Sequence, residues 1–124
     1  MKPIATENAP KAIGPYSQGM EVDGFLFVSG QLGIDPASGA LVTGGIKEQT
    51  KQCLTNAKAV IEAAKLCMCQ VVKATVLLAD MNDFAGMNEV YASFFKDPFP
   101  ARVAFQVARL PKDALVEIDL IVAK

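Results

Sequence analysis

Residues 46–78 read IKEQTKQCLTNAKAVIEAAKLCMCQVVKATVLL, and two hydrophobic patterns follow each other in this stretch. In the first part, apolar or small side chains recur every three to four residues, which predicts an amphipathic helix of about five turns beginning at Ile46. Val71–Leu78 is nearly continuous in apolar and β-branched residues, which predicts a strand buried on both faces. The core positions of the helix are Ile46, Thr50, Cys53, Leu54, Ala57, Val60, Ile61 and Ala64.

Upstream of this stretch, two short strands are predicted at Met20–Val22 and Phe25–Ser29. The Asp-Gly pair between them is a strong signal for a tight hairpin. Residues 7–18 contain two prolines and a glycine, which predicts an ordered loop that holds Tyr16 after a stiff segment. Gly30 at the end of the second strand allows a ligand or another backbone to approach closely.

Downstream, a second helix is predicted, with Asn82 or Asp83 as its cap and an end before Pro98. The last two strands are expected at Arg102–Arg109 and Leu115–Val122, and we expect them to pair as a hairpin. The apolar stripe of the helix is Phe84, Met87, Tyr91, Phe94 and Phe95, and the core face of the first strand is Val103, Phe105 and Val107. This order of elements predicts an α+β fold, a mixed sheet with two helices on one face.

The composition limits the class of protein. The chain has 124 residues, which is one domain, 1–124, and its 12 basic and 13 acidic residues leave a net charge of −1. That balance argues against a nucleic-acid-binding protein. Histidine is absent, which excludes Ser-His-Asp and Cys-His catalysis within one chain and the usual histidine-containing metal sites.

The cysteines and the apolar segments bear on the compartment. An odd number of cysteines (Cys53, Cys67 and Cys69) is a poor disulfide framework, so we expect reduced thiols. No secretory signal and no run of the ~18 apolar residues that a membrane span needs is present, so we expect a soluble, cytoplasmic protein.

Two charged residues in the last strands are candidates for chemistry. Arg102 follows a proline-restricted segment, and a guanidinium held by stiff neighbours can bind a carboxylate with two hydrogen bonds. From spacing alone, a surface arginine that keeps the strand end soluble is the favoured interpretation. Glu117 lies in the middle of a strand, where a carboxylate needs water or a partner, so it is either a solvated side chain or a general base. If the two strands pair as a hairpin, Arg102 and Glu117 share one face, on the order of 10 Å apart.

Several motifs taken together resemble the Rid family of small reactive-intermediate deaminases, also called the YjgF family. The similarity covers essentially the whole chain. Its pieces are Ala9–Gln18, Val28–Gln31, Phe84, Met87-Asn88, Tyr91, Phe94-Phe95, Pro100–Arg102, Val107–Pro111 and Val116–Ile118.

The resemblance implies a chorismate-mutase-like fold of about six strands, and a homotrimer with active sites between subunits. It implies hydrolysis of 2-imino acids, such as 2-iminobutanoate and 2-iminopropanoate, to 2-oxo acids and ammonia without metal or cofactor. Carried over residue by residue, Arg102 binds the substrate carboxylate and Glu117 activates water. The remaining pocket residues are Tyr16, Ser29, Gly30 and Asn88, which are by pattern alone more typical of turns and caps.

One position departs from the family. Members similar to the best-known deaminases often have a cysteine two residues after the arginine, where this chain has Ala104. A thiol role is excluded there, although the Ala104 backbone can still contact substrate. This departure keeps open an alternative function, a non-catalytic trimeric module that binds small carboxylates or 2-oxo acids. An activity on nucleic acid fits the net charge less well, and a chaperone-like role is not excluded by the sequence.

Overall fold

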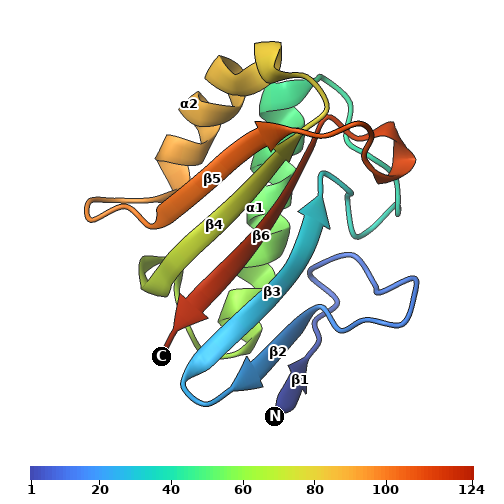
Figure 1. Cartoon of the computed structure of the whole chain (residues 1–124). Coiled ribbons are helices and arrows are strands. Elements are labelled where there is room, and N and C mark those ends of the chain that lie inside the picture. Colours follow the sequence, from blue (N-terminus) through green and yellow to red (C-terminus); the bar gives the residue numbers. More distant parts are fainter.

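The helices α1 and α2 lie side by side on one face of a six-stranded sheet (Figure 1), in a computed structural model that describes residues 1–124. The helices are α1 (Ile46–Ala63) and α2 (Phe84–Phe94), and the strands are β1 (Lys2–Ile4), β2 (Gly19–Val22), β3 (Phe25–Leu32), β4 (Val71–Leu78), β5 (Ala101–Gln106) and β6 (Val116–Ala123). The strand order is β1-β2-β3-β6-β4-β5, in which only β4 and β5 are parallel. The predicted α+β fold with a mixed sheet and two helices on one face is confirmed.

The core lies between α1, α2 and the sheet. Leu54, Val60 and Ile61 of α1 are fully buried against it, as the hydrophobic period predicts. The sheet contributes alternate residues of its central strands, among them Val76 of β4 and Ile118 of β6. The helix therefore forms because its apolar stripe is buried, and not because of capping, since its N-cap makes no side-chain hydrogen bond.

The predicted hairpin between the last two strands is wrong. β4 lies between β5 and β6, and it pairs in parallel with β5 and antiparallel with β6. The segment through α2 is long enough to carry the chain across the helix face, which allows this parallel connection. The predicted core face of β5 is also wrong, because Val103 and Phe105 are 44% and 48% exposed.

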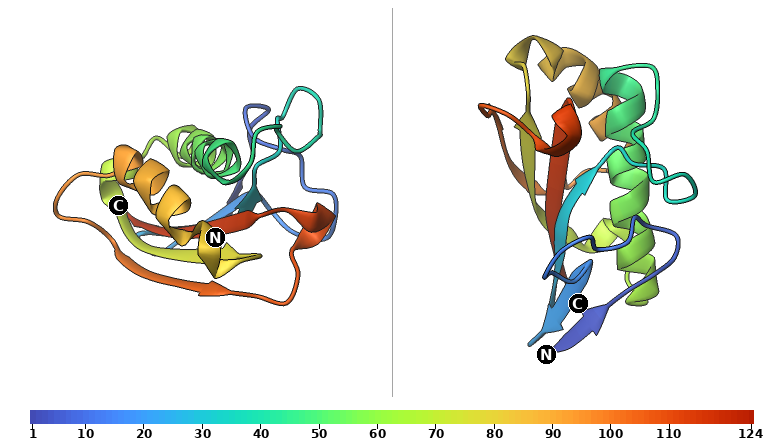
Figure 2. Two further views of the ribbon diagram at one scale, coloured as in Figure 1. Left: turned by 90° about the horizontal axis from the view of Figure 1, so that it is seen from above. Right: turned by 90° about the vertical axis from the view of Figure 1, so that its right-hand side faces the viewer.

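The other face of the sheet has no helix over it (Figure 2). Large apolar side chains are exposed on this open face, namely Phe25, Phe27, Val103 and Phe105. β4 is consequently buried on one face only, and the predicted burial on both faces is not found within one chain. An apolar surface of this kind typically marks a contact with another protein.

The cysteines and the cap of α2 also differ from the predictions. Cys67 and Cys69 form a disulfide across one residue, so only Cys53 is a free thiol, and the prediction of three reduced thiols is wrong for two of them. Neither predicted cap of α2 makes a capping hydrogen bond: Asp80 instead accepts from the Asn82 backbone at 2.8 Å, one short turn earlier. Neither helix has the length and hydropathy needed to span a bilayer.

Candidate functional site

A depression of the surface lies where the end of β3 and the start of β6 meet the N-terminal loop. It is a pocket of about 570 Å³, and two lysines, Lys11 and Lys112, line it together with two carboxylates. The predicted site residues found in it are Tyr16, Ser29, Gly30 and Glu117. Residues from three separate stretches of the sequence, at Tyr16, Ser29-Gly30 and Glu117, are therefore brought together.

Gly30 is required because of the position of Glu117. The regular pairing of β3 with β6 shifts between Val28 and Gln31, which is a bulge at Ser29 and Gly30. A Cβ atom placed on Gly30 would collide with the carboxylate of Glu117. The missing side chain of Gly30 therefore makes the space in which the Glu117 carboxylate lies against the β3 backbone.

The loop that carries Tyr16 is fixed by one buried amide. The side chain of Gln18 accepts a hydrogen bond from the Thr6 backbone at 2.7 Å and donates to three carbonyl oxygens, including that of Pro10 at 2.8 Å. Ser29 adds a second tie, because its hydroxyl donates to the Ser17 carbonyl at 2.5 Å. Sequence reasoning did not identify Gln18, since a glutamine in a loop has no pattern that indicates burial.

Glu117 is one of several titratable side chains that line this pocket. It is half-buried, and burial raises the pKa of its carboxyl group, with a further rise from the negative charge of Asp119. A carboxyl group in a pocket with a raised pKa is a candidate for general acid–base work. The pocket therefore contains a carboxylate that accepts a proton more readily than a fully solvated glutamate does.

Arg102 lies elsewhere, over α2. Its Nη1 donates to the Asn88 side-chain oxygen at 2.8 Å, and its guanidinium carbon lies 4.7 Å from the ring centre of Tyr91 and 5.5 Å from that of Phe84. Arg102 and Asn88, two of the predicted site residues, therefore contact each other, but neither lines the pocket around Glu117. The contribution of Tyr91 was not predicted, since its spacing is typical of a core residue.

Arg102 and Glu117 lie on opposite faces of the sheet within one chain. Arg102 is paired with Ala74, which is buried beneath the helices, whereas Glu117 is paired with Leu77 and points to the open face. The expected shared face is therefore wrong, because it rested on the hairpin that β4 interrupts. Ala104 lies on the same face of β5 as Arg102 and packs partly against the core.

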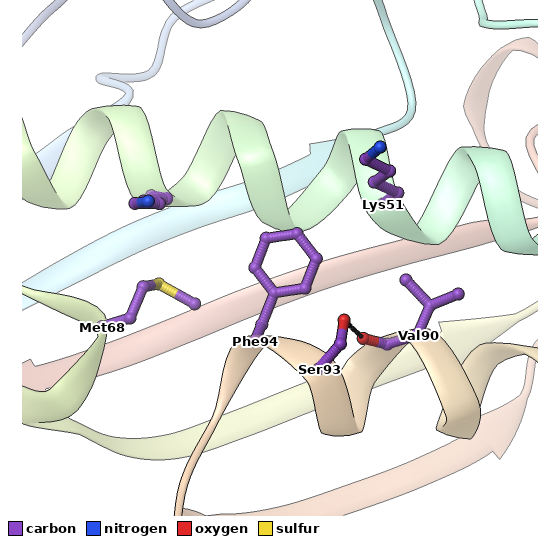
Figure 3. Close-up of a pocket in the computed structure, with 6 residues that line it drawn as sticks. Lys51, Met68, Val90, Ser93 and Phe94 are labelled. Carbon is purple, nitrogen blue, oxygen red and sulfur yellow. Dashed lines mark hydrogen bonds between the residues drawn. The ribbon is translucent and has the colours of Figure 1, made fainter.

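A second groove, between α1 and α2, does not contain the predicted residues (Figure 3). Phe94 and Met68 point into it, with Lys51 above them on α1. Half of the residues that line it are apolar, and the others are two lysines and a serine, so it has no carboxylate. No cluster of three or more metal-ligating side chains is present in the chain.

The comparisons with known proteins cover nearly the whole chain. The family model described as Endoribonuclease L-PSP matches residues 6–124. A goat protein named 2-iminobutanoate/2-iminopropanoate deaminase is 57% identical over 95% of this chain and 86% of its own length, and the human protein of the same name is 52% identical over the same shares. A RutC family protein of Pyrococcus horikoshii is 58% identical over 98% of this chain and 96% of its own.

Solved structures of similar proteins have the same fold as this chain. The crystal structure of Escherichia coli TdcF with bound serine has a TM-score of 0.95 and 42% identity, and covers 100% of this chain and 99% of that one. The YjgF gene product of Escherichia coli has the same TM-score, 45% identity and the same coverage. A whole-length match in sequence and in fold leaves no segment of the chain unaccounted for. The chain therefore belongs to this family, which is also known as the Rid or YjgF family.

Proposed function

We propose that this protein hydrolyses 2-imino acids, such as 2-iminobutanoate and 2-iminopropanoate, to 2-oxo acids and ammonia. Water adds to the imine carbon, the nitrogen leaves as ammonia, and the carbon becomes a carbonyl, so atoms balance without any other reactant. The observation that carries the proposal is Glu117, a half-buried carboxyl of raised pKa held over Gly30 in a pocket. Relatives that are 57% and 52% identical to this chain over the aligned residues bear the name of this activity.

Arg102 binds the substrate carboxylate in this proposal. One of its nitrogens is occupied by Asn88, and the guanidinium has five donors in all, so a second nitrogen remains for a ligand. A guanidinium matches a carboxylate with two parallel hydrogen bonds and fixes the direction of the rest of the molecule. Fixing the imine carbon in this way is a large part of what the site can contribute to the rate.

Glu117 positions and deprotonates the attacking water. The ionised carboxylate accepts the proton of the water as its oxygen adds to the imine carbon, and the protonated carboxyl can pass that proton to the departing nitrogen. The raised pKa suits the first step, because a more basic carboxylate accepts the proton of the water more readily. Tyr16, Ser29 and the Gly30 backbone line the pocket around this reaction. Asn88 and the Ala104 backbone line it from the side of Arg102.

The two halves of the site come from two copies of the chain. Arg102 and Glu117 lie on opposite faces of one sheet, so a pocket that contains both needs an arginine from a second copy. The exposed apolar residues of the open face, Phe25, Phe27, Val103 and Phe105, give that copy a surface to pack on. We propose a homotrimer, as the resemblance to the Rid family implies, with one site at each interface.

The test is imine hydrolysis by the purified protein. An amino-acid oxidase generates the imine in place, and semicarbazide traps what remains. Wild-type protein is expected to remove the imine faster than buffer, and Arg102→Ala to lower kcat/KM by about a hundredfold or more. Glu117→Gln is expected to bind 2-oxobutanoate normally but to lower kcat by about a hundredfold.

Matched controls make the result specific. Arg109→Ala removes the only other arginine, which is exposed and paired with Asp113, and is expected to retain activity. Asp119→Asn removes a carboxylate from the same strand and face as Glu117, and is expected to retain activity as well. Carboxylate binding without hydrolysis in the wild type would establish the binding module instead. No hydrolysis and no binding would refute both.

A further inference from the structure

We propose that Tyr91 is a positioning residue, whose ring holds the Arg102 guanidinium in the orientation that binds a carboxylate. This role rests on the proposed function of Arg102 in the reaction. Tyr91 lies in α2, and neither the sequence pattern nor the pocket around Glu117 assigns it a part in the site. Three contacts on one face of α2 support the proposal.

The first two contacts are aromatic. The guanidinium carbon of Arg102 lies 4.7 Å from the centre of the Tyr91 ring and 5.5 Å from that of Phe84. Both distances fall within the ~6 Å over which a cation is attracted to the face of an aromatic ring. Arg102 is thereby held against the helix instead of moving freely in solvent.

The third contact fixes the rotation of the guanidinium. Asn88 accepts a hydrogen bond from Nη1 at 2.8 Å. Phe84, Asn88 and Tyr91 are spaced by four and then three residues along α2, so they lie on one helix face. One helix therefore presents a ring, an amide oxygen and a second ring to a single side chain of β5.

Tyr91 is itself rigidly held. It is 5% exposed, and its ring centre lies 4.6 Å from that of Phe95. Its hydroxyl is buried and makes no hydrogen bond within the chain, so the ring is the part of Tyr91 that acts on Arg102. Burial raises the pKa of the Tyr91 hydroxyl, although the charge of Arg102 lowers it, so the ring stays neutral beneath the cation at neutral pH.

The experiment compares Tyr91→Leu, Tyr91→Phe and Phe95→Leu with the wild type. Tyr91→Leu keeps an apolar side chain but removes the aromatic face, and is expected to raise KM by about 3- to 30-fold with little change in kcat. KM is the expected parameter because the carboxylate is held equally in the ground state and the transition state. Tyr91→Phe keeps the ring and is expected to recover most of the lost affinity.

Phe95→Leu is the matched control. Phe95 is as buried as Tyr91, at 8% exposed, and stacks on it, but no contact between Phe95 and Arg102 is found. This variant is expected to lower the melting temperature as much as Tyr91→Leu does, without the rise in KM. A rise in KM of equal size in Phe95→Leu would mean that general loosening of the core is the cause, and would overturn the proposal.

A second readout does not depend on turnover. The chain has only two arginines, Arg102 and Arg109, so protein labelled with nitrogen-15 arginine gives two Nε–H signals. The Arg102 signal is expected to be displaced by the Tyr91 ring, and to move towards the position of a free arginine in Tyr91→Leu but not in Phe95→Leu. Arg109, which is exposed and paired with Asp113, is the internal reference.

The outcomes separate the two proposals. An active wild type with an unchanged KM in Tyr91→Leu overturns the role of Tyr91 and leaves the deaminase proposal standing. An Arg102 signal that does not respond to Tyr91→Leu overturns the positioning contact itself. A wild type that neither hydrolyses imines nor binds 2-oxobutanoate overturns the proposed function, and with it the role of Tyr91.

Discussion

At the scale of single residues, the partial burial of Glu117 makes its carboxylate a better base but lowers the stability of the folded protein when the group is ionised. Its carboxyl is half-buried, and burial and the neighbouring Asp119 raise its pKa above the value in the unfolded chain. A carboxyl whose pKa is raised by folding favours the folded state when protonated and disfavours it when ionised. Its stabilising contribution is therefore full below the unfolded pKa and is lost as pH rises through the folded pKa.

Replacing Glu117 by glutamine is expected to stabilise the protein at neutral pH. The variant removes an ionised group from a partly buried place, and the gain is about 0.5 kcal/mol after screening by solvent. The difference from wild type should shrink as pH falls and vanish below about pH 4, where the wild-type carboxyl is protonated too. Thermal unfolding at a series of pH values measures it, and a variant less stable than wild type at pH 7 would contradict the assignment.

Gly30→Ala is expected to reduce kcat by about tenfold or more, because the new methyl group displaces the Glu117 carboxylate. The backbone of Gly30 is extended strand that alanine also adopts, so the effect is steric. Steady-state kinetics measure the effect, with Gly24→Ala as a comparison at a hairpin turn with a φ of 84°, where alanine strains the backbone but nothing lies within 4 Å of the added atom, so that stability and not kcat is expected to fall. A fully active Gly30→Ala would show that Glu117 does not act from its observed place.

At the scale of elements, α1 holds the two strand ends that form the pocket. Asn56 is fully buried and its amide donates to the carbonyls of Leu32 and Ile34, at 3.1 and 2.8 Å. Gln49, two turns nearer the start of the helix, accepts from the Leu115 backbone at 2.9 Å, just before β6. Both Leu32 and Ile34 line the pocket, so these polar groups connect the helix to the site.

Asn56→Ala is expected to destabilise the protein by about 2–3 kcal/mol, because two carbonyls lose their donor in a buried place. Urea unfolding followed by circular dichroism measures the loss. Thr55→Ala is the control, since Thr55 is exposed and bonds only within its own helix, and it should change stability by less than about 0.5 kcal/mol. Equal stabilities of the two variants would refute the role given to Asn56.

The elements that the sequence predicted well are those in which the hydrophobic pattern arises from a single face buried in the core. The helix from Ile46 and the strand Val71–Leu78 have such a pattern, and both were located correctly. β5 was placed against the wrong neighbour, because its exposed Val103 and Phe105 alternate like core residues. Local periodicity shows that a face is apolar but not what covers it. The position of Arg102 relative to Glu117 depended on that pairing, so it could not be predicted.

At the scale of the whole molecule, no element of the same chain covers the apolar side chains on the open face of the sheet. Phe25 and Phe27 on β3, and Val103 and Phe105 on β5, are each at least 44% exposed. The helix face, by contrast, covers a closed core. The exposed apolar face and the division of the candidate site between two faces are both accounted for by the homotrimer that we propose.

Phe105→Glu is expected to dissociate the assembly and to abolish turnover, because a charge cannot be buried in the contact without a partner. Light scattering after gel filtration gives the mass, and the imine assay gives the activity. Ser93→Glu places the same charge on the exposed side of α2 and should keep both mass and activity. A Phe105→Glu protein that remains assembled and active would place the contact elsewhere.

The most direct test of a shared site is complementation between two inactive variants. Arg102→Ala keeps Glu117, and Glu117→Gln keeps Arg102, so a mixed assembly regains intact sites only if each site draws these residues from different copies. In equal mixtures assembled together, about a quarter of wild-type activity is expected, since one ordered pair of chains in four is intact. Mixed assemblies that form but show no activity above that of either variant alone would contradict the account.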